Sequence, residues 1–377
     1  MENDGCTTPA QLIEMHLQKY GWTQRVLALI LDMNEQVVSR VMTGTKSIDA
    51  ELALRLNAAL GIDPNRLLQL QNDYELAKAK IEVRIDPTLP RRKRIFGDLP
   101  ITDMVKRGWL EGVTDVRDPN VESALCRFFN TSSVDDIGIL PHRPKKTDAL
   151  TEATPAQLAW LHRVRQLADE MLVSRYSPSS LSTGIRALSK LLVSADAARR
   201  VPRILTECGI RFVIVEALPS TRIDGVCLWL DESSPVVGLS TRFDRIDNFW
   251  FVLRHELEHV IQNHGRITAA LDTEMEKERP SSDLPKEESA ADAAAAEFCV
   301  PQESLNRFVS RKSPYFAERD ILGFSKTLGI HPGLVAGQLQ RKTGRYDLFR
   351  NHLVKIRSIV APGSLVDGWG DVAPVGG

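Results

Sequence analysis

Apolar residues over positions 9–70 recur at the spacing of amphipathic helices, in short stretches separated by turn residues. The first stretch is Gln11–Tyr20. Residues typical of helix ends mark the other boundaries: Thr23 and Asn34 as N-caps, and Gly44 and Gly61 directly after helices. The pattern predicts a set of short helices, one of which runs from Asn34 to about Met42.

Two stretches interrupt this pattern in the middle of the chain. Residues 85–100 and 141–148 are rich in proline and basic residues. We interpret the first as a linker or hinge and the second as a further break. Residues 155–172 return to helical spacing, so a strongly amphipathic helix is expected there.

The period of the pattern becomes that of strands between residues 209 and 241. Strands are expected at Gly209–Val215, Gly225–Leu230 and Pro235–Leu239. Helices are expected over about residues 245–263, 286–299, 316–328 and 332–343. The last 19 residues contain five Gly and two Pro, which indicates a loose tail.

Composition narrows the class of protein. The chain has 377 residues, with 48 Lys and Arg against 49 Asp and Glu, and a net charge of −1. No uncharged apolar run reaches the roughly 18 residues that a membrane helix needs, which excludes an integral membrane protein. The N-terminus lacks the basic and apolar regions of a signal peptide, and the five cysteines form no CxxC pair. We therefore expect a cytoplasmic protein with reduced thiols.

Two of the predicted helices have the arrangement of a helix-turn-helix motif, whose short second helix presents polar side chains to DNA bases. The outer face of that helix carries Gln36, Ser39 and Arg40, and Val37 and Val41 are expected to face inward. Arg40 can bond guanine or phosphate, and Gln36 can read adenine. A small helical bundle without DNA contacts has the same spacing, so spacing alone leaves both interpretations open.

Local charge limits how strongly one copy of the chain can bind DNA. Residues 1–70 carry 6 Lys and Arg against 8 Asp and Glu, a net charge of −2, and extension to Gly97 gives 13 against 12, or +1. Most of the gain comes from Arg91–Arg94, which either contacts phosphates or is a solvated linker. We therefore expect a homodimer, in which two copies share the DNA contacts.

The segment LALILDMNEQVVSRVMTGTKSIDAELALRLNAALGI resembles the XRE, lambda-repressor-type helix-turn-helix family, close to its HigA-like antitoxin branch. The matching residues are Val38–Arg40, Gly44 and Ala53–Leu56, whereas Asp32 stands where the family usually has glycine in the turn. The resemblance implies binding to operator DNA. The residues expected to contact DNA are Thr23, Gln24, Arg25, Asn34, Gln36, Ser39, Arg40 and Lys46.

His255-Glu256-Leu257-Glu258-His259 is the strongest chemical signal in the chain. Residues four apart on a helix share a face, so both imidazoles can bind one zinc ion. Glu256 then faces the water of the site and can act as general base. The apolar run Phe249–Leu253 before the motif indicates that this helix is buried.

A catalytic zinc site takes three protein ligands, so the motif needs one more. The next predicted helix contains Glu287, Glu288 and Asp292. Glu288 is the predicted third ligand and Glu287 the competing choice, because one residue decides which carboxylate faces inward. Asp292 is expected to accept a hydrogen bond from one of the ligating histidines and so fix its tautomer.

These two segments resemble the ImmA/IrrE metallopeptidase family, a gluzincin-like group. FWFVLRHELEHVIQNH matches its active-site helix and EESAADAAAAEFCVP its second motif, and the similarity extends over roughly residues 155–350. The resemblance implies a zinc-dependent endopeptidase that acts on a repressor or antitoxin partner and is often genetically paired with a toxin. Glu258 and Ala294 depart from the pattern, which commonly has Gly or Ala at the first position and Phe at the second.

Two further features are candidate parts of the site. Gluzincin-type sites commonly use a His or Tyr to stabilise the developing oxyanion. His331 is the predicted residue for this role and His264 the alternative, although either can instead be a helix-capping or solvated histidine. Pro235–Leu239 is the expected edge strand for a substrate backbone, with Arg242 or Arg245 near the cleft.

These signals predict a multidomain chain. Its expected parts are an all-α helix-turn-helix domain at residues 1–75, a linker or helical connector at 76–150, an α+β zincin-like domain with a small sheet and the HExxH helix at 151–350, and a C-terminal tail at 351–377. In one hypothesis, the chain is a DNA-binding regulator whose endopeptidase domain cleaves a partner repressor or toxin. In the alternative, it is a non-proteolytic antitoxin or repressor whose zincin domain serves partner binding or sensing.

Overall fold

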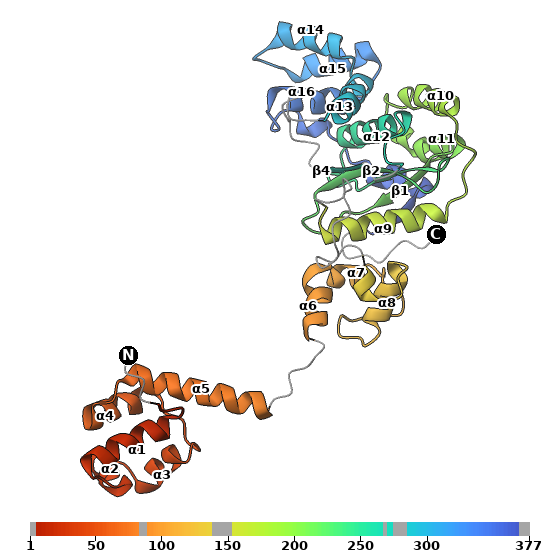
Figure 1. The fold of residues 1–377 in the computed structure, drawn as a ribbon. Helices are drawn as coiled ribbons and strands as arrows, with labels where there is room; N and C mark the ends of the chain where they lie inside the picture. The colour runs from red at the N-terminus through yellow and green to blue at the C-terminus, as the bar shows by residue number, and fades with distance from the viewer. Residues whose placement is uncertain (1–4, 83–88, 138–152, 267–269, 274–284, 369–377) are drawn as a thin grey trace. The chain divides into compact units, whose positions relative to one another are not determined.

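The computed structural model of the chain describes residues 5–82, 89–137, 153–266, 270–273 and 285–368. These residues belong to two compact units, Met1–Leu89 and Pro90–Gly377 (Figure 1). The division follows residue 89, whereas the sequence suggested boundaries at residues 75 and 150. The helices expected to form a separate connector are part of the later unit.

The described part of the first unit consists of helices and turns, as the hydrophobic pattern predicts. The helices are α1 (Pro9–Tyr20), α2 (Gln24–Ile30), α3 (Glu35–Met42), α4 (Ala50–Leu60) and α5 (Pro64–Glu82). Both predicted N-caps are confirmed, because Val26 N–H donates a hydrogen bond to the Thr23 hydroxyl and Gln36 N–H donates one to Asn34 Oδ1. The helices enclose one core of mainly Leu, Ile and Val side chains.

The turn between α2 and α3 accounts for the aspartate found where the XRE family usually has glycine. Asp32 has a φ angle of 50°, in the left-handed region that glycine adopts without steric penalty. An L-residue pays roughly 1–2 kcal/mol there, and Asp and Asn tolerate the conformation better than most. The departure therefore leaves the turn geometry intact.

The inward face of α3 differs from the expected one. Val38 and Val41 are buried, with 4% and 7% of their surface exposed, whereas Val37 is only partly buried. The prediction that Val37 packs against the core is wrong. Spacings of three and four residues both fit a helix of 8 residues, so the pattern could not choose between them.

The later unit begins with helices where a linker was expected. They are α6 (Leu89–Asp98), α7 (Ile101–Lys106) and α8 (Val121–Phe128), followed by the 3₁₀ turn η1 (Val134–Asp136). Ile95 and Leu99 are buried in a core that includes Trp160. The linker interpretation is therefore wrong for residues 89–98, which form α6. The composition misled because the basic residues of this segment outnumber the two apolar residues that pack into the core. Residues 85–88 and the predicted break at 141–148 lie outside the described residues.

The rest of the later unit is a sheet covered by helices. The helices are α9 (Pro155–Asp169), α10 (Pro178–Ser189), η3 (Ala195–Arg200), α11 (Val201–Glu207), α12 (Ile246–Ile261), α13 (Lys286–Cys299), α14 (Gln302–Lys312), α15 (Glu318–Leu328), α16 (Pro332–Thr343), η4 (Arg350–His352), α17 (Arg357–Val360) and η5 (Ala361–Gly363). The strands are β1 (Arg211–Val215), β2 (Ile223–Trp229), β3 (Pro235–Leu239), β4 (Ala270–Thr273) and β5 (Leu365–Asp367).

The sheet is mixed, with the strand order β4-β2-β3-β1-β5. β1 runs parallel to β3 and β5, whereas β2 runs antiparallel to β3 and β4. β3 is an inner strand, since Val237 pairs with Phe212 on one side and with Cys227 on the other. The prediction that Pro235–Leu239 is an edge strand for substrate is therefore wrong: β1 and β2 already occupy both of its edges.

Side chains that alternate along the strands fill two cores, one on each face of the sheet. On β1, Phe212 and Ile214 belong to a core that includes α12 and α13, whereas Val213 and Val215 belong to one that includes α9. Figure 1 shows α12 on one face of the sheet and α9 on the other. This arrangement agrees with the predicted α+β class and buries α12 deeply.

Part of the predicted C-terminal tail completes the sheet. β5 pairs in parallel with β1. The Asp367 carboxylate is fully buried and accepts hydrogen bonds from Trp109 Nε1, at 3.1 Å, and from Arg163 Nε. The prediction of a loose tail is therefore wrong for residues 351–367. It rested on glycine and proline counts, which carry no information about a buried ion pair with a distant residue. Residues 369–377 lie outside the described residues.

Two expectations about the chain as a whole can be compared with the structure. Each of the five cysteines is a free thiol, as their count and spacing predict. Burial raises the pKa of the Cys208 and Cys299 thiols, so neither is a thiolate at neutral pH. Within the described ranges, no helix combines the length and apolarity needed to cross a membrane.

Asp367→Ala is expected to lower the free energy of unfolding of the later unit by about 3 kcal/mol, because Arg163 loses its buried counter-charge. Urea unfolding followed by tryptophan fluorescence measures this change. Asp196→Ala is the matched control: it removes the exposed partner of Arg199 and should cost less than about 1 kcal/mol. Equal losses in the two variants would contradict the role assigned to Asp367.

Candidate functional site

The HELEH segment lies on α12, in the interior of the later unit. The predicted burial is confirmed, since each residue of Phe249–Leu253 is at most 6% exposed. His255, Glu256 and His259 are exposed by 2%, 0% and 1%. Buried polar and charged side chains are stable only when they are hydrogen-bonded, paired or bound to a metal. Neighbouring elements must therefore supply partners to α12.

His255, His259 and Glu288 of α13 meet at one point. The Nε2 atoms of the two histidines are 3.0 Å apart, and they lie 3.3 and 3.5 Å from the carboxylate oxygens of Glu288. All three residues offer a ligand atom within 4.8 Å of the others. In a tetrahedral zinc site with Zn–N bonds of about 2.0–2.1 Å, ligand atoms are about 3.3 Å apart. The donor atoms and their spacing therefore fit zinc.

The structure brings Glu288, rather than Glu287, to the histidines. Glu287 is 66% exposed and lies 3.7 Å from the Nε2 atom of His264, outside the three-residue group. Consecutive helical residues point about 100° apart, so only one of the two carboxylates can face α12. The packing of α13 against α12 selects Glu288.

Two residues in series position Nδ1 of His255, the ring nitrogen that does not face Glu288. This Nδ1 atom lies 3.0 Å from Asp292 Oδ1, and Arg341 of α16 donates a hydrogen bond to Asp292 Oδ2 at 2.9 Å. An ionised carboxylate only accepts, so Nδ1 carries the proton and the Nε2 lone pair faces Glu288 and His259. Asp292 thus has the geometry predicted for it. Arg341 was missed, because it follows 49 residues later on another helix with no motif spacing to reveal it.

His264 holds the corresponding ring nitrogen of His259, its Nδ1 atom. His259 Nδ1 lies 2.9 Å from His264 Nδ1. When His259 directs its Nε2 lone pair to a metal, its Nδ1–H donates to His264 Nδ1, and the proton of His264 then lies on Nε2, toward Glu287. One tautomer of each ring satisfies the whole series. His264, the alternative oxyanion residue, is therefore placed behind a metal-ligand candidate.

Glu256 occupies space that Gly225 of β2 leaves open. A Cβ atom added at Gly225 would overlap Glu256 Oε1 and would lie 2.8 Å from Val252 Cγ1. β2 and α12 can approach this closely only because residue 225 has no side chain. The sequence carried little signal for this contact, because Gly225 is the first residue of the predicted strand Gly225–Leu230, where a glycine is unremarkable, whereas β2 begins at Ile223.

Glu258, which departs from the ImmA/IrrE pattern, is engaged along its own helix. Arg254 forms an ion pair with its carboxylate at 2.7 Å, and Gln262 donates a hydrogen bond at 2.9 Å. Burial alone raises the pKa of the Glu258 carboxyl, but these hydrogen bonds and the charge of Arg254 outweigh it and hold the pKa below its ordinary value. Glu258 is thus a paired carboxylate and not a member of the three-residue group.

His331, the predicted oxyanion residue, is the N-cap of α16. Its Nδ1 atom accepts a hydrogen bond from Gly333 N–H at 3.0 Å, and the backbone N–H of His331 donates to Leu192 O. Burial, and to a smaller extent His352, lowers the pKa of His331, so the ring is neutral at pH 7. This is the capping role left open as the alternative, and the catalytic role stays a prediction.

The two arginines expected near the cleft are both ion-paired. Arg242 binds the buried Asp224 through two hydrogen bonds of 3.2 Å each. Arg245 binds Asp247 at 3.0 and 2.6 Å and also donates to Gln340. Their guanidinium groups therefore brace the segment that leads into α12.

The predicted DNA-contact residues of the first unit divide into caps and exposed side chains. Thr23 and Asn34 cap α2 and α3, and Gln24 is partly buried. The exposed members are Arg25, Gln36, Ser39, Arg40 and Lys46. Within the described residues, the side chains of Arg25, Gln36 and Arg40 make no hydrogen bond or ion pair, so their polar groups are available to a ligand.

Comparisons with known proteins identify both parts of the chain. A helix-turn-helix family model matches residues 13–67, and the model of the IrrE N-terminal-like domain matches residues 208–319. The chain is also similar to YddM of Escherichia coli strain K12, an uncharacterized HTH-type transcriptional regulator, with 29% identity over 77 residues. That match covers 20% of this chain and 82% of YddM. Both domain resemblances expected from the sequence are confirmed.

Glu288→Gln is expected to weaken zinc binding by about 100-fold or more, because it removes the negative charge of the third ligand. Glu287→Gln is the matched control and should stay within a few-fold of wild type, since this carboxylate lies outside the group. Zinc affinity is measured by competition with a chromophoric chelator at neutral pH. A larger loss in Glu287→Gln would show that the ligand assignment is wrong.

Proposed function

Because the chain joins a helix-turn-helix domain to an IrrE N-terminal-like domain, we propose that it is a cytoplasmic DNA-binding regulator whose later unit is a zinc-dependent endopeptidase. The substrate is a partner regulatory protein, a repressor or a toxin-system component. The meeting of His255, His259 and Glu288 beside the buried Glu256 carries the peptidase part of this proposal.

The donor set supports zinc as the metal. Two neutral imidazoles and one carboxylate are the ligands of many catalytic zinc sites, which leave a fourth position open. When bound, zinc supplies the Lewis acidity that polarises a peptide carbonyl and activates water. The hydrogen bonds behind the two histidines, between His255 and Asp292, which Arg341 holds, and between His259 and His264, orient the rings for a metal.

Glu256 supplies the proton transfers of peptide hydrolysis. Its carboxylate takes a proton from the attacking water and delivers it to the leaving amine, so it acts first as a base and then as an acid. The close approach of Gly225 restricts the positions open to this carboxylate. Full burial also excludes bulk water, which strengthens the electrostatic interactions of the site.

The first unit directs this enzyme to DNA. α3 is the proposed recognition helix, with Gln36 and Arg40 directed at base edges or phosphates. Residues 1–70 have a net charge of −2, so one copy has little non-specific attraction for DNA. A homodimer that reads two half-sites compensates for this weakness. Operator binding would then place the peptidase in the circuit that it regulates.

Glu256→Gln is expected to lower the rate of substrate cleavage by about 10²–10⁴-fold, because the amide cannot accept the proton of water. The variant should keep its zinc and its operator affinity, which chelator competition and gel-shift titration measure. Cleavage is followed with the regulatory protein encoded beside this chain. A variant that processes this partner at the wild-type rate would exclude Glu256 as the general base. An intact partner after incubation with the zinc-loaded wild type would support the alternative, a domain that binds its partner without cleaving it.

Arg40→Ala and Gln36→Ala are each expected to weaken operator binding by about tenfold or more, since each removes a base or phosphate contact. Arg55→Ala is the charge-matched control: Arg55 is exposed on α4 and pairs with Glu51. Fluorescence anisotropy with operator DNA at two salt concentrations gives the affinities, and thermal unfolding checks that α3 stays folded. Equal affinities of the Arg40 and Arg55 variants would exclude α3 as the recognition helix.

A further inference from the structure

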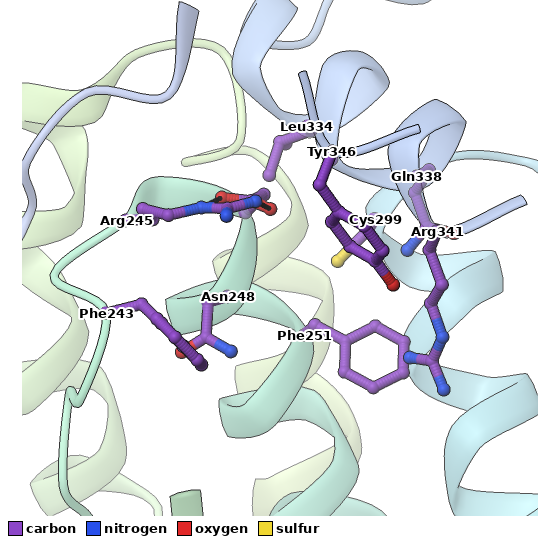
Figure 2. A pocket seen from close by; sticks show the side chains of 11 residues that line it. Phe243, Arg245, Asn248, Phe251, Cys299, Leu334, Gln338, Arg341 and Tyr346 are labelled. Carbon is purple, nitrogen blue, oxygen red and sulfur yellow. Dashed lines mark hydrogen bonds and ion pairs between the residues drawn. The ribbon is translucent and has the colours of Figure 1, made fainter. Parts of the chain in front are cut away.

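A pocket lies between α12, α16 and the chain that follows α16. Its walls include Phe243, Asn248, Phe251, Gln338, Arg341 and Tyr346. Figure 2 shows Phe243 and Asn248 on one side and Phe251 with Arg341 on the other. The cavity volume is about 190 Å³, smaller than the roughly 300–1,000 Å³ of sites for drug-sized ligands. This size suits a single amino-acid side chain.

The pocket and the metal group share structural elements. Phe251 precedes His255 by one helical turn, and their ring centroids are 6.4 Å apart. Arg341 stacks on the Phe251 ring, with its guanidinium carbon 4.3 Å from the centroid. The same guanidinium holds Asp292, which in turn holds His255. The pocket therefore begins one helical turn before His255 on α12, and it shares Arg341 with the residues that hold the His255 ring.

The charges around the pocket are neutralised. Arg341 is paired with Asp292, and Arg245 with Asp247. The Cys299 thiol is buried and protonated at neutral pH, since burial raises its pKa. An occupant consequently meets no unpaired charge, and a charged side chain would lose its hydration without gaining a counter-ion.

Two carboxamides complete the lining. Asn248 and Gln338 are partly buried, and within the described part of the chain their side chains make no hydrogen bond. A carboxamide both donates and accepts, so each can pair with the N–H or C=O of a peptide backbone. The apolar walls, Phe243, Phe251 and Leu334, surround the space between them.

We propose that this pocket is the specificity site of the peptidase and takes a bulky apolar side chain, such as Leu, Met or Phe, next to the scissile bond. Asn248 and Gln338 hold the backbone of that substrate residue, and Phe243 and Phe251 contact its side chain. The inference rests on the endopeptidase function proposed above. It extends that function by naming a feature of the substrate sequence.

The test uses peptide hydroxamates, which chelate zinc and need no turnover. Two series are made, with a benzyl side chain or a hydrogen on either side of the hydroxamate, so that both chain directions are covered. Their affinities for the zinc-loaded full-length protein are measured by calorimetry. In one series the benzyl compound is expected to bind at least about tenfold more tightly than its glycine counterpart, the discrimination typical of an apolar side-chain pocket.

Gln338→Trp should abolish this preference, because an indole fills the pocket. Glycine-type hydroxamates should still bind through the unchanged metal group, but more weakly than to wild type, because the Gln338 carboxamide no longer holds their backbone. Phe243→Ala, at the exposed rim, should reduce the preference and serves if the tryptophan variant fails to fold. Lys326→Trp, on the exposed surface of α15, is the control and should keep it. Zinc content is measured for every variant.

The outcomes separate the two proposals. Equal binding of the benzyl and glycine compounds in both series would overturn the pocket assignment and leave the peptidase proposal standing. A preference that survives in Gln338→Trp would also overturn it. Failure of every hydroxamate to bind protein that holds stoichiometric zinc would overturn the peptidase proposal, and the specificity site with it.

Discussion

The later unit depends on one constraint: α12 carries ionisable groups into a buried interior, where each group needs a partner. His255, His259 and Glu256 are almost completely buried. An unpaired charge in such a place costs several kcal/mol, so the elements around α12 cannot be positioned independently. α13 brings Glu288 and Asp292, α16 brings Arg341 to Asp292, and the turn after α12 returns His264 to His259. The helices on this face of the sheet are therefore arranged around a polar centre as well as an apolar core.

The sheet that packs against α12 makes this arrangement possible. Gly225 lets β2 approach α12 closely enough to confine Glu256. β1 and β3 form the buried middle of the sheet, and β5 closes the β1 edge through the Asp367 carboxylate, which binds Trp109 and Arg163. Residues separated by more than 200 positions thus hold one layer together. The candidate metal ligands on α12 therefore lie on a rigid platform, which a metal site needs if its donor atoms are to stay within about 0.5 Å of their positions.

The corrections share a cause. A local pattern reports what each residue prefers, but not which partner it meets. Val37 and Val38 fit the apolar stripe of α3 about equally, and only contacts with α1 and α2 choose Val38. Pro235–Leu239 reads as a strand in sequence, yet its place between β1 and β2 follows from pairing between distant segments. The buried residues Ile95 and Leu99 were missed for a similar reason. Composition averages the exposed basic face of a helix with its buried apolar face, and only packing distinguishes the two.

The sequence alone determined the helix-turn-helix, the caps Thr23 and Asn34, and the α12 motif, since each signal lies within a few residues and obeys helical spacing. It narrowed the third carboxylate to Glu287 or Glu288, and only the packing of α13 against α12 distinguishes the two. Only the tertiary structure decided the members that come from elsewhere: Arg341 behind Asp292, His264 behind His259, Gly225 against Glu256, and the pocket lined by Phe251 and Gln338. The physical reason is that the two histidines of the motif lie on one helix with fixed spacing. The residues that orient them and line the neighbouring pocket are brought together by packing between helices and strands, which leaves no period in the sequence.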